Sequence, residues 1–168
     1  IKKSIKSFQT QIYKNKEHVI IDGGSIDGTL EVIMKFKNRN LILSTSSDNG
    51  IYDALNKGIN LSSGDIVGIL HSDDYYKDNK VLKTIAETFK KTDADLVYGD
   101  LVYVNKKYPF KVLRYWKAGK YFEKNLFNGW MPPHPTVFIK RSVFNRIGKY
   151  KTNYHISSDY DFLVRVFS

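Results

Sequence analysis

The fold prediction rests on one stretch, Ile66-Val67-Gly68-Ile69-Leu70-His71-Ser72-Asp73-Asp74. Its apolar first half is typical of a buried strand, and the adjacent carboxylates Asp73 and Asp74 follow where that strand would end. Sheets of α/β proteins bind ligands at this carboxyl edge. Two neighbouring carboxylates repel each other unless a cation or a shared proton lies between them. Oxygen ligands suit Mg²⁺ or Mn²⁺, which also bind phosphate, so the stretch predicts a metal–diphosphate site.

Strands and helices alternate around this stretch as far as about residue 100. The expected strands are 18–22, 41–44, 66–70 and 96–98, and the expected helices lie near 5–12, 29–34, 51–59 and 78–90. The helix near 29–34 should bury Leu30, Ile33 and Met34, and the first helix should place Ile5, Phe8 and Ile12 on one face. Such alternation predicts an α/β fold with a mainly parallel sheet flanked by helices and related to the Rossmann fold.

The second half, 101–168, predicts a smaller antiparallel part. Alternating aromatic and basic side chains over 100–116 indicate exposed antiparallel strands. A loop rich in Gly and Pro at 128–135 precedes a strand at 136–139, a helix from about Ser142 and a last helix that opens near 157–159. We expect one domain, 1–168. A sheet of this type normally opens with a strand, so we also expect that its first strand is missing and that the chain is truncated at both ends.

The composition narrows the classes of partner. The 168 residues include 27 Lys and Arg against 17 Asp and Glu, a formal net charge of +10. This excess favours polyanions such as nucleic acid, anionic lipid or phosphate-bearing substrates, although solubility alone would also explain most of the lysines. Cysteine is absent, which excludes disulfides and thiolate metal sites. No apolar run approaches the roughly 20 residues that cross a bilayer.

A glycine-rich loop, Asp22-Gly23-Gly24-Ser25-Ile26-Asp27-Gly28-Thr29, follows the first expected strand. Glycines let a backbone approach a ligand, and a loop that leads into a helix favours anionic groups. Asp22, at the strand end, is suited to accept hydrogen bonds from a nucleobase or a ribose. The alternative is a plain turn with an Asp as helix N-cap.

A second loop that leads into a helix is expected at 48–58. Asn56 lies inside a helix that asparagine does not favour, which indicates a specific hydrogen bond, whereas ordinary helix packing is the alternative. For Asp73 and Asp74 the alternative is a solvated turn or an N-cap of the next helix.

Three further residues are candidates in the second half. His134, among prolines, is suited to contact a metal or phosphate, or else is simply packed. Asp159 is suited to act as a general base, or else is the N-cap of the last helix. Arg165, one turn beyond, either contacts substrate or pairs with a carboxylate.

These pieces, in this order and over nearly the whole chain, resemble the inverting glycosyltransferase family 2 with its GT-A fold. The family pattern is matched by Asp22 with the loop 24–29, by 49–58, by Gly64-Asp65 and by 72–74. Further on, 134–136 and 158–162 with Arg165 are similar to the acceptor-side loop and the helix that carries the base.

The resemblance implies a nucleotide-sugar-binding part at about 1–100 and an acceptor-side part at about 101–168. Asp22 would bind the nucleobase, Asp73 and Asp74 would hold the ribose and a Mn²⁺ or Mg²⁺ ion, and Asp159 would be the catalytic base. The implied substrate-binding residues are Asp22, Gly24, Ser25, Asp27, Asn49, Asn56, Asp73, His134 and Arg165. The sequence departs from the family at His71, which replaces the first carboxylate of the commoner Asp-x-Asp-Asp form.

The implied reaction is metal-dependent, inverting transfer of a sugar from a nucleotide-diphosphate sugar to a hydroxyl of a glycan or lipid-linked glycan. The setting would be bacterial surface polysaccharide, such as capsule or lipopolysaccharide, made in the cytoplasm. Peripheral association with the inner face of the plasma membrane is a further expectation, and nucleic acid is not an expected partner. The alternatives are an inactive domain that binds nucleotide sugar or glycan, and a sugar nucleotidyltransferase.

Overall fold

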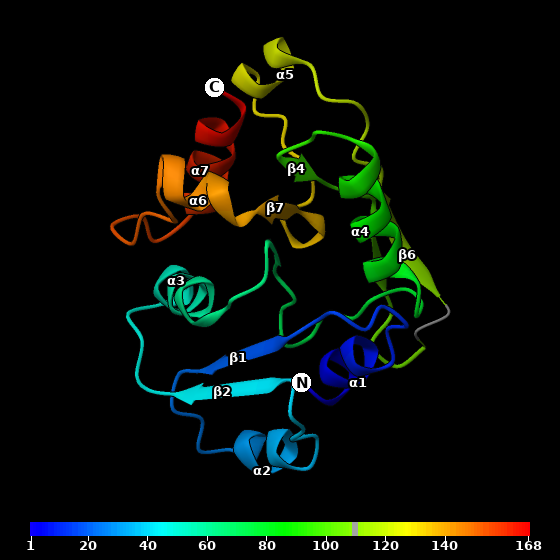
Figure 1. Cartoon of the computed structure of the whole chain (residues 1–168), viewed down its shortest axis with the longest axis vertical. Coiled ribbons are helices and arrows are strands. Elements are labelled where there is room, and N and C mark those ends of the chain that lie inside the picture. The colour runs from blue at the N-terminus through cyan, green and yellow to red at the C-terminus, as the bar shows by residue number, and fades with distance from the viewer. Residues whose placement is uncertain (109–110) are drawn as a thin grey trace.

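The computed structural model describes residues 1–108 and 111–168, with its helices and strands labelled in Figure 1. The helices are α1 (Lys2–Gln9), α2 (Thr29–Met34), α3 (Ile51–Leu61), α4 (Val81–Lys91), α5 (Glu123–Phe127), α6 (Arg141–Ile147) and α7 (Ser158–Phe167), with a short 3-10 helix at His134–Thr136. The strands are β1 (His18–Asp22), β2 (Leu41–Thr45), β3 (Ile66–Gly68), β4 (Leu96–Val97), β5 (Leu101–Val104), β6 (Val112–Trp116) and β7 (Phe138–Lys140).

Strands β1 and β2 form a parallel pair, joined through α2, with Asp22 opposite Thr45 at their carboxyl ends. Parallel neighbours need a crossover of this kind, because a tight turn can join only antiparallel strands. Helices α1 and α2 lie beside the pair (Figure 1). The buried residues of this small core are Ile5, Ile20, Ile33 and Leu41.

Strand β7 lies between β3 and β4 and runs antiparallel to both. The α/β class, with a parallel sheet and antiparallel strands, is confirmed, but the strands before residue 100 are less uniformly parallel than their alternation with helices predicts. Among the described residues, the β1–β2 pair and the β3–β7–β4 sheet share no hydrogen-bonded strands. The physical reason is that β7 comes from the second half of the chain, and hydrophobic periodicity does not reveal a strand's partner. The expectation of one truncated domain that lacks its first strand stays a prediction.

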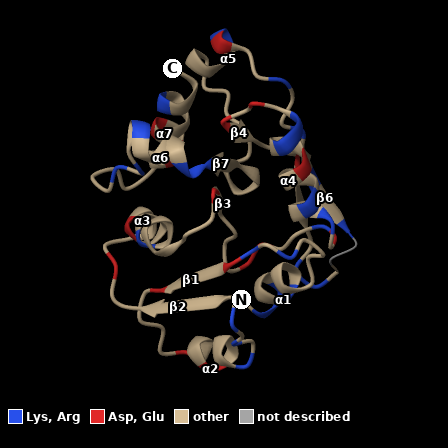
Figure 2. Ribbon diagram, viewed as in Figure 1, with Lys and Arg blue, Asp and Glu red and all other residues tan. Residues whose placement is uncertain are grey.

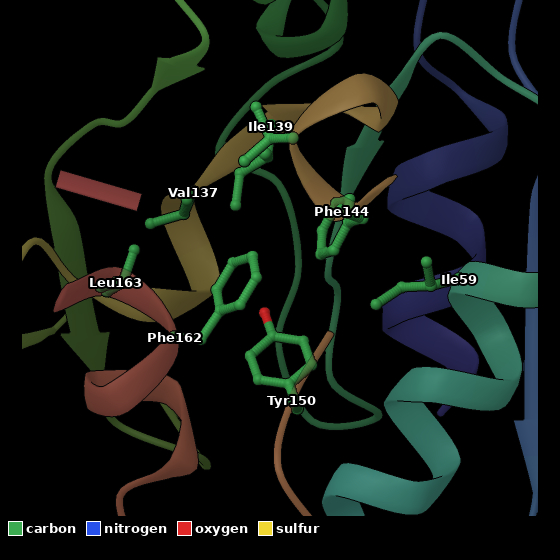
Figure 3. Packing of buried hydrophobic residues seen from close by; sticks show 8 residues of the cluster. Ile59, Val137, Ile139, Phe144, Tyr150, Phe162 and Leu163 are labelled. Carbon is green, nitrogen blue, oxygen red and sulfur yellow. The ribbon is translucent and has the colours of Figure 1, made fainter. Parts of the chain in front are cut away.

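The larger core lies where α3, α6 and α7 meet β7 (Figure 3). Phe162 of α7 is fully buried, and its ring centroid lies 5.1 Å from that of Phe144 and 4.7 Å from that of Tyr150. The amphipathic last helix that the sequence predicts is therefore confirmed. The other buried members are Ile59, Val137, Ile139, Val143 and Leu163.

Several boundaries differ from the predicted ones. The strand predicted at 136–139 begins at Phe138, because Pro135 has no N–H and its ring suits the 3-10 turn His134–Thr136. Met34 is exposed rather than buried, since α2 ends there. Ile12 lies beyond the end of α1 and is also exposed. The antiparallel strands predicted within 100–116 are confirmed as β5 and β6.

The buried strand predicted at 66–70 is shorter and less buried than expected, since β3 ends at Gly68 and its residues are half-buried or exposed. Gly68 ends the strand beneath an aromatic ring. A Cβ atom on Gly68 would overlap the Cδ1 and Cε1 atoms of Phe138, which lies directly opposite in β7. The close approach of β3 to β7 therefore depends on glycine at this position.

We expect Gly68→Ala to lower the free energy of unfolding by about 1–3 kcal/mol, the usual cost of overpacking. Chemical denaturation measures this change. Gly99→Ala is the matched control, since no atom lies within 4 Å of the added methyl group. Adding Phe138→Leu should restore part of the loss in the Gly68→Ala protein; equal stabilities for Gly68→Ala and Gly99→Ala would contradict the packing argument.

Candidate functional site

Asp22 ends β1 in a buried position and organises the loop that follows. Its Oδ2 atom accepts hydrogen bonds from the N–H groups of Gly24 and Ser25, at 3.0 and 2.9 Å. These bonds, with one from the Ser25 hydroxyl, lower the pKa of Asp22 below its usual value despite burial. Asp22 is therefore a fixed, ionised acceptor. Asp27 instead faces solvent, where its Oδ1 atom binds the N–H and hydroxyl of Thr29.

The loop before α3 lies against the loop after β1. The Ser46 N–H donates to the Asp22 carbonyl at 3.1 Å, and a Cβ atom on Gly23 would lie 2.6 Å from Asp48 Oδ2. The N–H of Asn49 donates to Asp53 of α3. The structure thus brings the predicted residues Asp22, Gly24, Ser25 and Asn49 to one edge, where the parallel strands β1 and β2 end.

Asp73 and Asp74 lie in a turn closed by a hydrogen bond from the Asp74 N–H to the His71 carbonyl at 3.1 Å. The alternative that either caps the next helix is wrong, because α4 has Lys80 at its N-cap. Asp73 is exposed, whereas Asp74 is half-buried. Burial, together with the charge of Asp73, raises the pKa of Asp74, and His71 opposes this shift. Two neighbouring carboxylates therefore lie at this turn, and His71 balances them only in part.

The turn has the chemistry of a hard-cation site. No group of three or more His, Cys, Asp or Glu side chains able to hold a metal occurs among residues 1–108 and 111–168. Mg²⁺ or Mn²⁺ commonly takes only one or two protein carboxylates and completes its shell with water and phosphate oxygens. Two adjacent carboxylates, one of them partly desolvated, fit that donor set.

Asp159 lies in the first turn of α7 and is not its N-cap, so the alternative structural role is wrong. The N-cap is Ser157, whose left-handed backbone (φ 68°) turns the chain into the helix. The Asp159 Oδ1 atom accepts a hydrogen bond from the Tyr52 hydroxyl of α3 at 3.2 Å. Burial and the neighbouring Asp159 charge both raise the pKa of Tyr52, so Tyr52 remains a hydrogen-bond donor at neutral pH.

His134 is buried beside Asp159. Its Nε2 atom lies 2.9 Å from the hydroxyl of Tyr150, and its ring centroid lies 6.3 Å from that of His71. Burial lowers the pKa of His134 to about 4, and the charge of Asp159 opposes this shift. His134 is therefore a neutral imidazole at pH 7. Because His71 is the first residue of the Asp73–Asp74 turn, His134 lies between that turn and Tyr150.

Two predicted binding residues make internal contacts. The side chain of Asn56 donates to the Tyr150 carbonyl at 2.8 Å and accepts from the Tyr150 N–H at 3.1 Å, which confirms the specific hydrogen bond expected for it. Arg165 pairs with Asp161 at 2.9 Å and donates to the carbonyls of Ile147 and Lys149, so the alternative of pairing with a carboxylate is confirmed. Substrate contacts by either residue stay predictions.

We expect Asn56→Ala to lower the free energy of unfolding by about 2 kcal/mol, because both backbone groups of Tyr150 lose their partner in a half-buried place. Asn60→Ala, one turn further along the exposed side of the same helix, is the matched control and should change it by less than about 0.5 kcal/mol. Thermal or urea unfolding distinguishes the two. Similar losses in both variants would contradict a specific role for the Asn56 hydrogen bonds, since alanine favours a helix more than asparagine does.

The sequence analysis did not single out Tyr52 and Tyr150 as site residues. Tyr52 shares the helical stripe of Leu55 and Ile59, so the 3.6-residue period of α3 was a usable signal for its burial. Tyr150 has no local signal, since its partners Asn56 and His134 are 94 and 16 residues away. Tyr52 also lines a small hollow of about 50 Å³ whose other lining residues are Asn49, Gly50, Ile51, Thr152, Tyr154 and His155.

A family model described as glycosyl transferase family 2 matches residues 1–148. The chain belongs to glycosyltransferase family 2. A curated relative, the PGL/p-HBAD biosynthesis glycosyltransferase of Mycobacterium bovis (strain BCG / Pasteur 1173P2), is 30% identical over 168 residues, which are 98% of this chain and 63% of the relative. The chain therefore spans less than two thirds of the length of that relative.

Solved structures confirm the GT-A-type fold of this family 2 member. The crystal structure of S. aureus TarS aligns with a TM-score of 0.76 at 20% identity, covering 98% of this chain and 50% of the other. The mannosyltransferase PcManGT from Pyrobaculum calidifontis, in complex with GDP-Man and Mn²⁺, aligns with a TM-score of 0.70 at 17% identity, covering 96% and 46%. None of the described helices has the length and apolarity to cross a bilayer.

Proposed function

We propose that this family 2 member transfers a sugar, with inversion, from a nucleotide-diphosphate sugar to a hydroxyl of an acceptor. The observation that carries the proposal is the hydrogen bond from Tyr52 that orients the Asp159 carboxylate. The ring of His134 lies 6.3 Å from that of His71, the first residue of the turn that bears Asp73 and Asp74, two acidic groups suited to a cation. Solved structures of TarS with UDP and with UDP-GlcNAc support this class of donor.

The donor nucleotide would lie at the edge formed by the loops that follow β1 and β2. Asp22, kept ionised by the Gly24 and Ser25 amides, is suited to accept a hydrogen bond from the nucleobase. Gly24, Ser25, Asp27 and Asn49 would surround the nucleotide. Asp73 and Asp74 would contact its ribose and hold Mn²⁺ or Mg²⁺, an ion that neutralises charge on the departing diphosphate.

Asp159 would act as the base. Its carboxylate takes the proton of the acceptor hydroxyl while that oxygen forms a bond to the anomeric carbon and the bond to the diphosphate oxygen breaks. The electron pair of the broken bond leaves with the nucleoside diphosphate. The Tyr52 hydroxyl fixes one carboxylate oxygen of Asp159, and neutral His134 adds no competing positive charge.

We propose a glycan or lipid-linked glycan of bacterial surface polysaccharide as the acceptor. The support is the family together with the curated relative named for PGL/p-HBAD biosynthesis. The cytoplasmic location stays a prediction. The alternatives of an inactive binding domain and of a nucleotidyltransferase become outcomes of the tests below.

Asp159→Asn is expected to lower turnover at least 100-fold, the usual contribution of general-base catalysis, while nucleotide binding changes little. The measurement is release of UDP or GDP from a panel of nucleotide sugars, with a calorimetric titration of the nucleotide. Asp161→Asn is the control, since this carboxylate is two residues away and pairs with Lys151 and Arg165. It should lower the unfolding midpoint and leave turnover within a few-fold.

Equal turnover in the wild type and in Asp159→Asn would reject the assigned base. Nucleotide binding without turnover in any variant or donor would favour the inactive binding domain. Pyrophosphate release from a nucleoside triphosphate and a sugar phosphate would favour the nucleotidyltransferase.

Removal of divalent metal with EDTA should abolish turnover, and Mn²⁺ or Mg²⁺ should restore it. Asp74→Ala should weaken nucleotide binding in the presence of Mn²⁺ but change it little in EDTA, because the carboxylate would act through the ion. Asp65→Ala, an exposed carboxylate just before β3, is the control. Full turnover in EDTA after exhaustive dialysis would contradict metal dependence.

A further inference from the structure

The β5–β6 hairpin pairs with no other described strand and has an exposed apolar face. Val102 and Tyr115 are directly opposed, and side chains of opposed residues share a face. Leu113 lies at a shift of the register and has no partner residue on β5. Leu113 and Tyr115 are 60% and 58% exposed. An isolated two-stranded sheet is marginally stable in water, so a covering partner would stabilise this one.

Cations border this face at both ends. Residues 101–122 contain six basic and no acidic side chains. The basic residues are Lys106, Lys107, Lys111, Arg114, Lys117 and Lys120. Figure 2 shows basic segments on β6 and on the neighbouring helix α4. On the opposite face of the hairpin, the Arg114 guanidinium lies 5.6 Å from the ring centroid of Tyr103 and 5.5 Å from that of Trp116.

We propose that the β5–β6 hairpin docks on an anionic lipid surface, with Val102, Leu113 and Tyr115 entering the interface and the flanking lysines contacting headgroups. The Asp100 carboxylate, just before β5, accepts a hydrogen bond from the Tyr115 hydroxyl at 2.6 Å, and the six basic residues of 101–122 outnumber it. This combination of apolar side chains, aromatic rings and excess cations matches the chemistry of that surface. The docking would hold this part of the protein against the leaflet through a surface contact, and it does not depend on the proposed transferase reaction.

Two other occupants match this face less well, a second copy because of its charge and nucleic acid because of its polar surface. In a symmetric dimer the same patch would face itself, which would bring two sets of six cations together. Single-stranded nucleic acid would match the charge and stack on aromatic rings, but it offers nothing to cover aliphatic side chains such as Val102, Val112 and Leu113. An anionic bilayer satisfies both the charge and the aliphatic surface.

Co-sedimentation with phosphatidylglycerol and phosphatidylcholine vesicles tests the proposal on the whole protein. The wild type should bind the anionic vesicles, and replacing Lys106, Lys107 and Lys111 by Gln should weaken that binding about 100-fold, at roughly fivefold per charge. The matched control replaces Lys35, Lys37 and Arg39 by Gln, which removes the same charge near α2 from equally exposed positions. Equal weakening in both variants, or no binding to anionic vesicles, would overturn the proposal.

The absence of cysteine from the chain allows a second, site-specific readout. Leu113→Cys and Met34→Cys both replace exposed apolar side chains, and each can carry one environment-sensitive fluorophore. Anionic vesicles should increase the emission at position 113 and not at position 34. An unchanged signal at 113 would refute docking even if the lysine variant failed to fold.

A response at 113 to protein concentration alone would assign the face to a second copy. Displacement of vesicles by equimolar oligonucleotide would assign it to nucleic acid.

Discussion

Helix α3 joins the two halves of the candidate site through its side-chain hydrogen bonds. Asn56 holds both backbone groups of Tyr150, and Tyr52 binds the carboxylate of Asp159. On its other side, α3 packs on β1, where a Cβ atom on Gly58 would make an ordinary contact of 3.5 Å with Cγ1 of Ile21. The same helix therefore contacts the strand that ends in Asp22 and the segment that carries Asp159. The position of Asp22 relative to Asp159 depends on this link.

The pKa values of two site carboxylates, Asp22 and Asp74, are shifted in opposite directions. At Asp22, amide and hydroxyl donors stabilise the ionised carboxylate, so its pKa is lowered although it is buried. At Asp74, partial burial raises the pKa, His71 opposes this shift and the neighbouring Asp73 adds to it. The ionised Asp22 carboxylate is thus stabilised by donors of its own loop, whereas a bound cation would stabilise the ionised Asp74 carboxylate.

Much of the site could be predicted from local sequence, because its carboxylates follow strands or open a helix. Asp22, Asp73 and Asp159 were all predicted from such positions. Asp22 does end β1 and Asp159 does lie in the first turn of α7, whereas β3 ends at Gly68, five residues before Asp73. The hydrogen-bond partners of Asn56 and Arg165 were harder to predict from the sequence. A helical Asn indicates that a hydrogen bond exists, but the identity of its partner, 94 residues away, is a property of the folded chain.

The sequence by itself determined the α/β class, the family and the order of the strands, helices and loops, because hydrophobic periodicity and turn residues act over short distances. Only the tertiary structure decided that β7 lies between β3 and β4, that Tyr52 contacts Asp159 and that His134 is neutral. These features arise from contacts between residues far apart in the chain and from burial. Local sequence patterns encode neither.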